Sequence, residues 1–455
     1  MCQTGSMKEV EVRPGEEDSK ILLARSSDGD KVFATAPKCT HYGAPLVKGV
    51  LSGDRIVCPW HHACFNCGTG DIEDAPALEN LRTYDVSIEG DDIMVDPTGL
   101  NQPVKEKPTK ASPHDPRTFV IVGGGAAGVT AAQTLRRDGF KGKIVMLTSE
   151  KHLPYDRIKL SKAPGIAADK IQLKSKEFYE GQDIEVRSGM AVKTIDTAAK
   201  QATLDDGSTL AYDHMLVATG SEARRIPIPG SDCENVYTLR CPEDSSAIAE
   251  AAKTKGKDTN VAIVGTGFIG MELAASLKKS LDLQNVTVIG MESVPFENVL
   301  GKPVGDFVKK AGEGFGIHFE MGTSVKRITT DGGKKATGVE LGSGKIVDAD
   351  FVVLGVGAKP VAPFQEGDGS NVSVNKDGSV NTDENLNVLD INSSPIESLW
   401  AAGDIAKFPY WYTNQKVRIE HWDVAQQHGR IAAQNMVAKS DNRPQNPFRD
   451  VPFFW

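Results

Sequence analysis

The sequence predicts a small all-β domain followed by a larger α/β region made of two copies of one strand–loop–helix unit. Residues 8–96 alternate short apolar runs with turn pairs such as Gly53-Asp54, a pattern typical of β structure. From Arg117 onward a buried strand leads into a glycine-rich turn and a helix, and this pattern recurs 142 residues later. At 455 residues, the chain has room for about three domains.

Composition narrows the classes of function. Hydrophobic residues make up 39% of the chain and charged residues 25%, as in ordinary globular proteins. The net charge is −9 and no block of Lys or Arg interrupts it, which argues against a nucleic-acid partner. The sequence has no apolar run near the ~18–20 residues that span a bilayer, and no signal or transit pattern. A cytosolic location without a transmembrane segment is therefore the default expectation.

The β region should contain strands near residues 21–23, 31–34, 55–57, 84–88 and 92–95. A proline-rich segment follows it, with prolines at positions 97, 103, 108, 113 and 116. Such a composition predicts an extended, solvated linker.

The two α/β units align without gaps when Phe119 is paired with Val261. FVIVGGGAAGVTAAQTLRR then matches VAIVGTGFIGMELAASLKK, so that strand, glycines and helix coincide. The same offset pairs Glu150 with Glu292, each 22 residues beyond the third glycine of its loop. The chain therefore contains two dinucleotide folds, the second inserted into or following the first.

The whole chain has seven cysteines, too few for a disulfide scaffold, and four of them fall in the segment from Cys39 to Cys67. Two loops in this region each pair a cysteine with a histidine: Cys39-Thr40-His41 and Cys58-Pro59-Trp60-His61. A Rieske [2Fe–2S] cluster needs two thiolates on one iron and two imidazoles on the other, and facing loops of this kind supply both. The alternative is a tetrahedral zinc site, although zinc motifs usually pair Cys with Cys and His with His. Cys64 and Cys67 are expected to be small buried apolar residues.

The glycine-rich loops have the spacing that binds a pyrophosphate at the start of a helix. The first glycine makes the turn, the second lets the backbone approach the phosphates, and the third lets helix and strand pack. Glu150 and Glu292 stand where a carboxylate binds a ribose hydroxyl. No Arg or Lys occurs within residues 286–294, which favours NADH over NADPH. The loop glycines are Gly123, Gly125 and Gly128 in the first unit and Gly265, Gly267 and Gly270 in the second.

Two nucleotide folds in one chain suggest one for FAD and one for a nicotinamide nucleotide. Two further apolar strands end at turns, one at Thr219-Gly220 and one at Gly403-Asp404. The carboxylate of Asp404 is placed to bind ribitol hydroxyls of a flavin nucleotide.

Residues 8–96 resemble the Rieske ferredoxin family, in its lower-potential branch, with His62 where that family usually has glycine. Residues 117–455 resemble the FAD/NAD-dependent reductases of oxygenase ferredoxins and the apoptosis-inducing factor family. Besides the two loops, the matching motifs are Pro154-Tyr155-Asp156-Arg157, Leu160-Ser161-Lys162, Gly403-Asp404 and Glu420-His421-Trp422.

The resemblance implies roles for individual residues. Arg157 and Lys162 would line the flavin, and a Lys162–Glu272 pair would stand beside its reactive nitrogen. A helix from about Trp422 would point its N-terminus at the flavin carbonyl, and Gly357 would lie near the nicotinamide. The expected divisions are a Rieske domain (1–98), a linker (99–116), an FAD domain (117–232 and 375–447), an NAD domain (233–374) and the start of an otherwise missing C-terminal domain (448–455).

These features predict an oxidoreductase that passes electrons from NADH through FAD to the Rieske cluster and on to an acceptor outside the chain. Two alternatives remain open: an NADH-sensing or pro-apoptotic signalling flavoprotein, and the reductase component of an oxygenase system. A disulfide-reductase mechanism is disfavoured, because the segment from Tyr155 to Lys162 has no cysteine. The resemblance also allows association with mitochondria.

Overall fold

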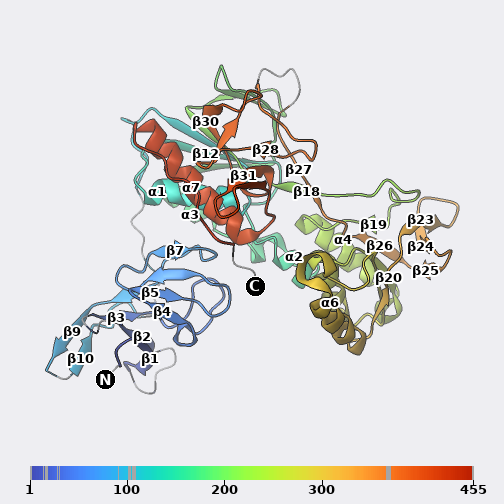
Figure 1. The fold of residues 1–455 in the computed structure, drawn as a ribbon, viewed down its shortest axis with the longest axis horizontal. Coiled ribbons are helices and arrows are strands. Elements are labelled where there is room, and N and C mark those ends of the chain that lie inside the picture. The colour runs from blue at the N-terminus through green and yellow to red at the C-terminus, as the bar shows by residue number, and fades with distance from the viewer. Residues whose placement is uncertain are drawn as a thin grey trace.

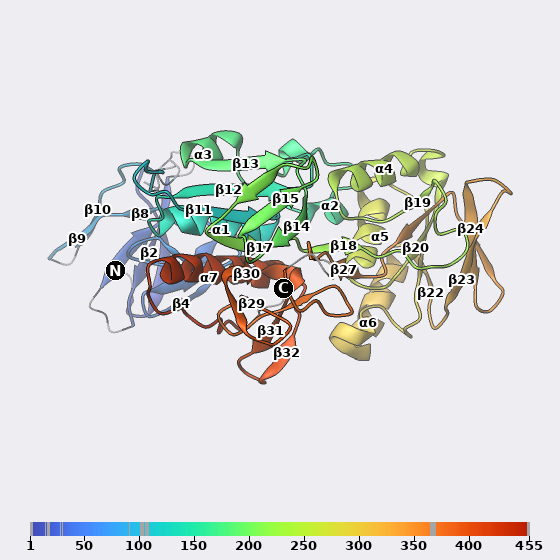
Figure 2. The same cartoon turned by 90° about the horizontal axis from the view of Figure 1, so that it is seen from above.

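A computed structural model describes residues 3–13, 15, 19–27, 29, 31–90, 92–100, 104, 109–364 and 370–452. A β domain at the N-terminus and an α/β domain on the opposite side both pack against a central α/β domain (Figures 1 and 2). These are the small all-β domain and the two domains built on strand–loop–helix units that the sequence predicts.

The β domain consists of two four-stranded antiparallel sheets and a two-stranded ribbon. Its core is formed by large apolar side chains, including Leu22, Leu46, Ile56 and Phe65, which are fully buried. The predicted strands are confirmed. One sheet contains β1 (Ser6–Glu11), β2 (Lys20–Arg25), β3 (Val32–Thr35) and β8 (Thr83–Tyr84), the other β4 (Val50–Ser52), β5 (Arg55–Val57), β6 (Cys64–Asn66) and β7 (Ile72–Asp74), and the ribbon β9 (Val86–Glu89) and β10 (Asp92–Val95).

The central domain is built on a six-stranded sheet that is parallel except at one edge. Its order is β13 (Ile184–Ser188), β12 (Lys143–Thr148), β11 (Thr118–Val122), β17 (His214–Val217), β30 (Pro395–Ala401) and β29 (Asn387–Leu389), with β29 antiparallel. Side chains of β11 alternate between two cores because successive residues of a strand face opposite sides. Phe119 and Ile121 meet helices α1 (Ala126–Arg137) and α7 (Trp422–Ser440), whereas Val120 and Val122 face the meander β14 (Val192–Asp196), β15 (Gln201–Leu204) and β16 (Thr209–Ala211).

Helices α1 and α7 approach each other closely at a glycine. A Cβ atom on Gly429 of α7 would lie 2.1 Å from the carbonyl oxygen of Ala127 on α1. The missing side chain therefore lets the last helix lie directly over the first glycine-rich loop. The central domain also contains α2 (Lys159–Lys162), α3 (Lys176–Gly181), β28 (Val380–Asn381), β31 (Ala406–Tyr410) and β32 (Gln415–Val417).

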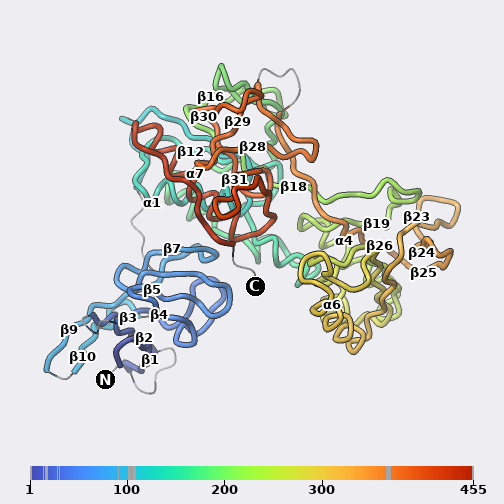
Figure 3. Tube along the Cα trace, in the orientation of Figure 1, coloured from blue at the N-terminus to red at the C-terminus, as the bar shows by residue number. Residues whose placement is uncertain are grey.

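The second α/β unit is inserted into the first. The chain leaves the central domain at β18 (Ser221–Ala223) and returns at β27 (Ala358–Pro360), and these strands pair antiparallel (Figure 3). The inserted sheet is parallel, in the order β19 (Val236–Tyr237), β26 (Phe351–Leu354), β20 (Asn260–Val264), β21 (Asn285–Ile289) and β22 (Ile317–Glu320). Around it lie α4 (Pro242–Ala252), α5 (Phe268–Ser280), α6 (Glu297–Gly314), β23 (Val325–Thr330), β24 (Ala336–Leu341) and β25 (Ile346–Asp348).

The second half of the predicted linker is hydrogen-bonded to the central domain, although most of residues 109–116 are exposed, as a solvated segment would be. The Thr109 amide donates to the carbonyl of Arg136 (3.2 Å), and the Ser112 amide donates to that of Lys141 (2.8 Å). These bonds attach residues 109–116 to the last turn of α1 and to the loop that follows it. Linker residues 101–103 and 105–108, and residues 453–455 at the predicted start of a C-terminal domain, lie outside the described residues. Among the helices described, none combines the length and apolar character that a membrane span requires.

Candidate functional site

The β domain brings the two predicted Cys-His loops together. Cys39 and Cys58 are each 3% exposed, and their thiols are hydrogen-bonded to each other. The rings of His41 and His61 lie edge to face with their centroids 4.9 Å apart. Two sulfurs on the inner side and two imidazoles on the outer side form the ligand arrangement of a Rieske cluster.

Two local features of this pocket fit a [2Fe–2S] cluster. Backbone groups of His41 and Tyr42 favour a thiolate at Cys39, and those of Trp60 and His61 favour one at Cys58, although the neighbouring Cys58 thiol and burial together raise the pKa of Cys39. Nδ1 of His41 is buried without a hydrogen-bond partner in the described part of the chain, so it is available as a ligand. Among the described residues, no three side chains of Cys, His, Asp or Glu are arranged to hold one metal ion together. A cluster with two protein ligands on each iron needs only pairs.

His62, which follows the second histidine, has a left-handed backbone (φ 65°). Glycine adopts this conformation without strain, which explains why the resembling family usually has glycine there. The chain keeps the loop geometry with a non-glycine residue. Cys64 and Cys67 are both 1% exposed, as predicted, and burial raises their thiol pKa values to about 11 and about 12.

The first glycine-rich loop has the geometry that its spacing predicted. Gly123 has φ 122°, and a Cβ atom there would lie 2.1 Å from the carbonyl oxygen of Ala218. A Cβ atom on Gly128 would lie 2.0 Å from the carbonyl oxygen of Gly123. At Gly125 nothing lies within 4 Å, so the backbone is open to a ligand directly before α1 begins. The helix N-terminus and this open backbone together suit a pyrophosphate.

Glu150, the predicted ribose ligand, is held by neighbours on the same edge of the sheet. Its carboxylate accepts hydrogen bonds from Arg157 Nη2 (2.8 Å) and the Tyr155 hydroxyl (2.7 Å). Burial disfavours the charged carboxylate, but the hydrogen bonds and positive charge of Arg157 outweigh burial and lower the pKa of Glu150. The residues expected to contact ribose and flavin therefore form one network.

Arg240 belongs to this network but was missed by the sequence analysis. Its carbonyl accepts a 2.5 Å hydrogen bond from Arg157, and its Nη2 lies 3.8 Å from Asp404 Oδ2. Arg240 is far from both residues in the sequence and belongs to no motif, so only the tertiary fold reveals it.

The other predicted strand ends meet at the same edge. Thr219 and Gly220 follow β17, and Gly403 and Asp404 follow the neighbouring strand β30. Asp404 accepts a hydrogen bond from the Ser221 hydroxyl at 2.7 Å, and the Thr219 hydroxyl donates to a loop carbonyl at 2.5 Å. Helix α7 begins at Trp422, as predicted.

Lys162 and Glu272 stand at the junction of the two α/β domains. Lys162 ends α2, Glu272 lies on α5, and Lys162 Nζ is 3.7 Å from Glu272 Oε1. Ser161 also donates a hydrogen bond to Glu272 at 2.5 Å. The structure thus brings the predicted catalytic pair together.

The second glycine-rich loop repeats the first. Gly265 has φ 120°, a Cβ atom on Gly270 would lie 2.2 Å from the Gly265 carbonyl oxygen, and Gly267 is open. Glu292 accepts hydrogen bonds from Thr266 (3.0 Å) and Asn298 (3.0 Å). Gly357 has φ 93°, where the chain turns back towards the central domain.

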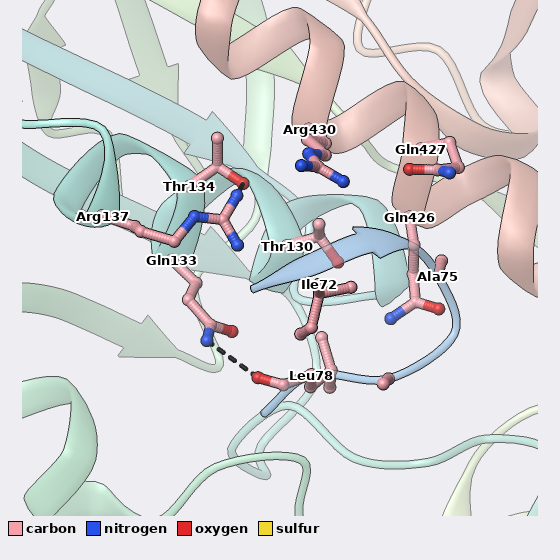
Figure 4. A pocket seen from close by; sticks show the side chains of 11 residues that line it. Ile72, Ala75, Leu78, Thr130, Gln133, Thr134, Arg137, Gln426, Gln427 and Arg430 are labelled. Atoms are coloured by element: carbon pink, nitrogen blue, oxygen red, sulfur yellow. Dashed lines mark hydrogen bonds between the residues drawn. The ribbon is translucent and has the colours of Figure 1, made fainter. Parts of the chain in front are cut away.

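The β domain docks on the central domain at two places. A strip of residues 73–79 contacts α1 and α7, and Figure 4 shows Gln133, Gln426, Gln427 and Arg430 around Ile72, Ala75 and Leu78. Gln133 donates to the Leu78 carbonyl at 2.8 Å, and Lys174 donates to the same carbonyl at 3.0 Å. The second place is the cluster loop, where the Tyr42 hydroxyl donates to Asp156 Oδ2 at 2.5 Å. The histidine pair therefore lies near the segment expected to line the flavin.

Two family models match the chain. The Rieske [2Fe-2S] domain matches residues 1–85, and the pyridine nucleotide-disulphide oxidoreductase family matches residues 117–429. Apoptosis-inducing factor 3 of Mus musculus is 38% identical over 462 residues, which cover 100% of this chain and 72% of the relative. Rhodocoxin reductase of Rhodococcus erythropolis is 31% identical over 74% of this chain and 75% of its own length.

A solved structure shares the α/β fold. The ferredoxin reductase for the CYP199A2 system from Rhodopseudomonas palustris superposes with a TM-score of 0.67 and 27% sequence identity. The match covers 74% of this chain and 79% of that one. The two family matches thus fall on the β domain and on the two α/β domains.

Proposed function

The chain belongs to the pyridine nucleotide-disulphide oxidoreductase family, with a Rieske domain in front, and we propose that it passes electrons from NADH through FAD to its own [2Fe–2S] cluster. It is an NAD(P)H-dependent flavoprotein oxidoreductase of the ferredoxin-reductase type. An acceptor outside the chain then receives the electrons. The name of the Rhodopseudomonas palustris protein makes a ferredoxin its partner, and here the fused Rieske domain takes that place.

One observation carries this proposal: the cluster loop contacts the segment that lines the flavin. Tyr42, next to the ligand His41, is hydrogen-bonded to Asp156, next to Arg157. A Rieske domain placed there is positioned to take electrons from a flavin in the central domain. The strip at residues 73–79 supports the same arrangement, because it attaches the domain to α1 and α7, the helices nearest the first glycine-rich loop.

We assign FAD to the central domain (117–232 and 375–447) and the nicotinamide nucleotide to the inserted domain (233–374). The open backbone at Gly125 would hold the FAD pyrophosphate, and the Glu150–Arg157 network would hold its ribose and flavin ends. Gly220, Gly403 and Asp404 would border the ribityl chain. The N-terminus of α7 at Trp422 would favour negative charge on the flavin carbonyl.

NADH is preferred over NADPH in this proposal because of the charge near the second loop. Glu292 stands where the ribose would bind, and residues 286–294 contain no Arg or Lys. A carboxylate accepts hydrogen bonds from ribose hydroxyls but repels a 2′-phosphate. Gly265, Gly267 and Gly270 would hold the pyrophosphate, and Gly357 would lie beside the nicotinamide.

The bound groups supply hydride acceptance and one-electron chemistry, and the chain supplies position and electrostatics. The Lys162–Glu272 pair lies at the junction of the two nucleotide domains, where nicotinamide and flavin would meet. Lys162 would there stabilise negative charge, and Glu272 would hold its ammonium group in place. No side chain is assigned as a nucleophile or general base.

An anaerobic titration tests the proposal. The protein is purified without air, its iron and flavin contents are measured, and its visible spectrum is recorded before and after stoichiometric NADH. We expect the flavin bands to bleach and a reduced Rieske signal to appear by electron paramagnetic resonance. Flavin bleaching without an iron signal would contradict transfer to the internal cluster. A colourless protein that contains zinc would overturn the cluster assignment.

A further inference from the structure

We propose that Tyr42 is a positioning residue that holds the cluster loop against the flavin-lining segment through its hydrogen bond to Asp156. This inference rests on the proposed function, since it concerns the transfer from flavin to cluster. It adds a role for a residue outside the ligand set and outside both nucleotide loops.

The ring of Tyr42 lies against the histidine pair. It stacks on the His41 ring with centroids 3.8 Å apart and an interplanar angle of 22°. It also meets the His61 ring edge to face, with centroids 5.6 Å apart. Because the Tyr42 ring contacts both imidazoles, a movement of its hydroxyl should also move the two histidine rings.

Asp156 is a rigid acceptor for the Tyr42 hydroxyl. The residue is 7% exposed, and its Oδ1 accepts a hydrogen bond from the Ile158 amide at 3.1 Å. Its own amide donates to the carbonyl of Ile171 at 2.7 Å, which ties the segment to the central domain. Lys159 adds its ammonium group, 3.8 Å from Asp156 Oδ2 and 5.3 Å from the Tyr42 ring centroid. The hydroxyl therefore meets a fixed, charged partner, which makes the hydrogen bond strong and directional.

The other docking contact does not depend on Tyr42. Lys174, whose side chain is 3% exposed, bonds the Leu78 carbonyl and pairs with Glu79. Gln426 of α7 donates to the Pro76 carbonyl at 3.3 Å. Because this strip attaches the domain by itself, loss of the Tyr42 hydroxyl should loosen the cluster loop without releasing the whole domain.

The step that this positioning serves is a single-electron transfer. Each NADH gives two electrons and becomes NAD⁺, with one proton released to solvent over the cycle. With both groups bound, each electron that left the flavin would reduce one Fe³⁺ to Fe²⁺, with no bond to the protein formed or broken. The second electron follows once the cluster has passed the first to its acceptor.

The test compares Tyr42→Phe, which keeps the stacked ring and removes the hydroxyl, with Tyr412→Phe, a matched change at a ring that is 74% exposed. Stopped-flow spectroscopy of the full-length protein follows flavin reduction by NADH and cluster reduction separately. We expect Tyr42→Phe to leave flavin reduction unchanged and to slow cluster reduction about tenfold, from the energy of one charge-assisted hydrogen bond. With Tyr42 intact, Asp156→Asn keeps an acceptor oxygen for its hydroxyl and should retain most of the wild-type rate. Cluster reduction within twofold of wild type in Tyr42→Phe would overturn the proposal.

A second readout requires no turnover. Hydrogen exchange of the oxidised protein, followed by mass spectrometry, should become faster in Tyr42→Phe at residues 38–43 and 156–160, while residues 73–79 stay as protected as in wild type. Unchanged exchange at residues 38–43 would contradict the positioning role even if NADH reduced no cluster in the wild type. Failure of the wild-type cluster to accept electrons would instead contradict the proposed function.

Discussion

The two glycine-rich loops have the same backbone but different surroundings. Gly123 and Gly265 have φ values of 122° and 120°, and in each loop the third glycine packs on the first. The residues that precede the third glycine differ. Ala126 and Ala127 are 7% and 4% exposed, whereas their counterparts Phe268 and Ile269 are 41% and 43% exposed.

The cause of this difference is helix α7. It covers the first loop, with Gly429 against the backbone of Ala127, and the inserted domain has no equivalent helix over its own loop among the described residues. The shared glycines give both loops a geometry that suits a pyrophosphate, and we propose that the covering helix makes the nucleotide of the first loop the one that stays bound. We therefore expect FAD to remain bound through purification and NADH to bind and leave.

Replacing the third glycine of each loop with alanine should produce the largest difference between the two loops. In Gly128→Ala the new Cβ atom would lie 2.0 Å from a backbone oxygen, and in Gly270→Ala the distance would be 2.2 Å. Each clash costs about 1–3 kcal/mol or more. We expect Gly128→Ala to retain less than about a tenth of its flavin, because the strain falls beneath α7. Gly270→Ala should stay yellow, resist reduction by NADH and still be reduced by dithionite. Equal flavin loss in both variants would contradict the comparison.

Giving each loop the residue that the other has before its third glycine tests directly whether α7 packs tightly on the first loop. Ala127→Ile places a large side chain where α7 lies against α1, and overpacking of this kind costs about 1–3 kcal/mol. Ile269→Ala shortens an exposed side chain and should change the free energy of unfolding by less than about 0.5 kcal/mol. Thermal unfolding and flavin release on dilution measure both effects. A tolerated Ala127→Ile would show that the cover is not tightly packed.

Neutralising Glu150 and neutralising Glu292 should likewise have different effects, the first on flavin binding and the second on NADH binding. Glu150→Gln removes the charged partner of Arg157, whose side chain is 21% exposed, and should weaken flavin binding by about 2 kcal/mol. Glu292→Gln should leave the flavin content unchanged and raise the KM for NADH about tenfold. It should also reduce the preference for NADH over NADPH. Steady-state kinetics with an artificial acceptor that takes electrons directly from the flavin measure the second effect. An unchanged ratio of NADH to NADPH use would remove Glu292 from the nucleotide site.

The last expected effect is on stability rather than on nucleotide binding, and it is a pH dependence carried by the covering helix. Burial, with help from Asp450 and Asp74, raises the pKa of Asp423 on α7 to about 7. A carboxyl group whose folded pKa is raised binds its proton more tightly in the folded state. Its contribution to stability is therefore complete below about pH 4 and declines as pH rises to about 7. The slope is at most about 1.4 kcal/mol per pH unit.

Calorimetry between pH 4.5 and 8 measures this slope. Asp423→Asn should flatten it and raise the melting temperature above pH 7, while the exposed-site control Asp169→Asn should leave it unchanged. A wild-type stability that rises across this range with no difference in Asp423→Asn would contradict the assignment.

Features with a local signature were predictable from the sequence. The glycine spacing, the Cys-His spacing and the start of α7 each depend on residues close together in the chain. Arg240 and the Tyr42–Asp156 bond were not predictable, because they join segments 83 and 114 residues apart. The prolines predict a solvated linker, and most of residues 109–116 are exposed, but the amides of Thr109 and Ser112 donate to the carbonyls of Arg136, in the last turn of α1, and of Lys141, in the loop after it. The composition of the linker does not reveal which backbone groups of the central domain lie beside it.

The strip at residues 73–79 and the helices it contacts belong to one chain, and this has a kinetic consequence. A tethered donor and acceptor meet at an effective concentration on the order of millimolar, whatever the concentration of the protein. Cluster reduction should therefore be a first-order process that dilution does not slow. Contacts such as the buried Lys174 are weakly screened, so salt that separates a free ferredoxin from its reductase should have little effect here.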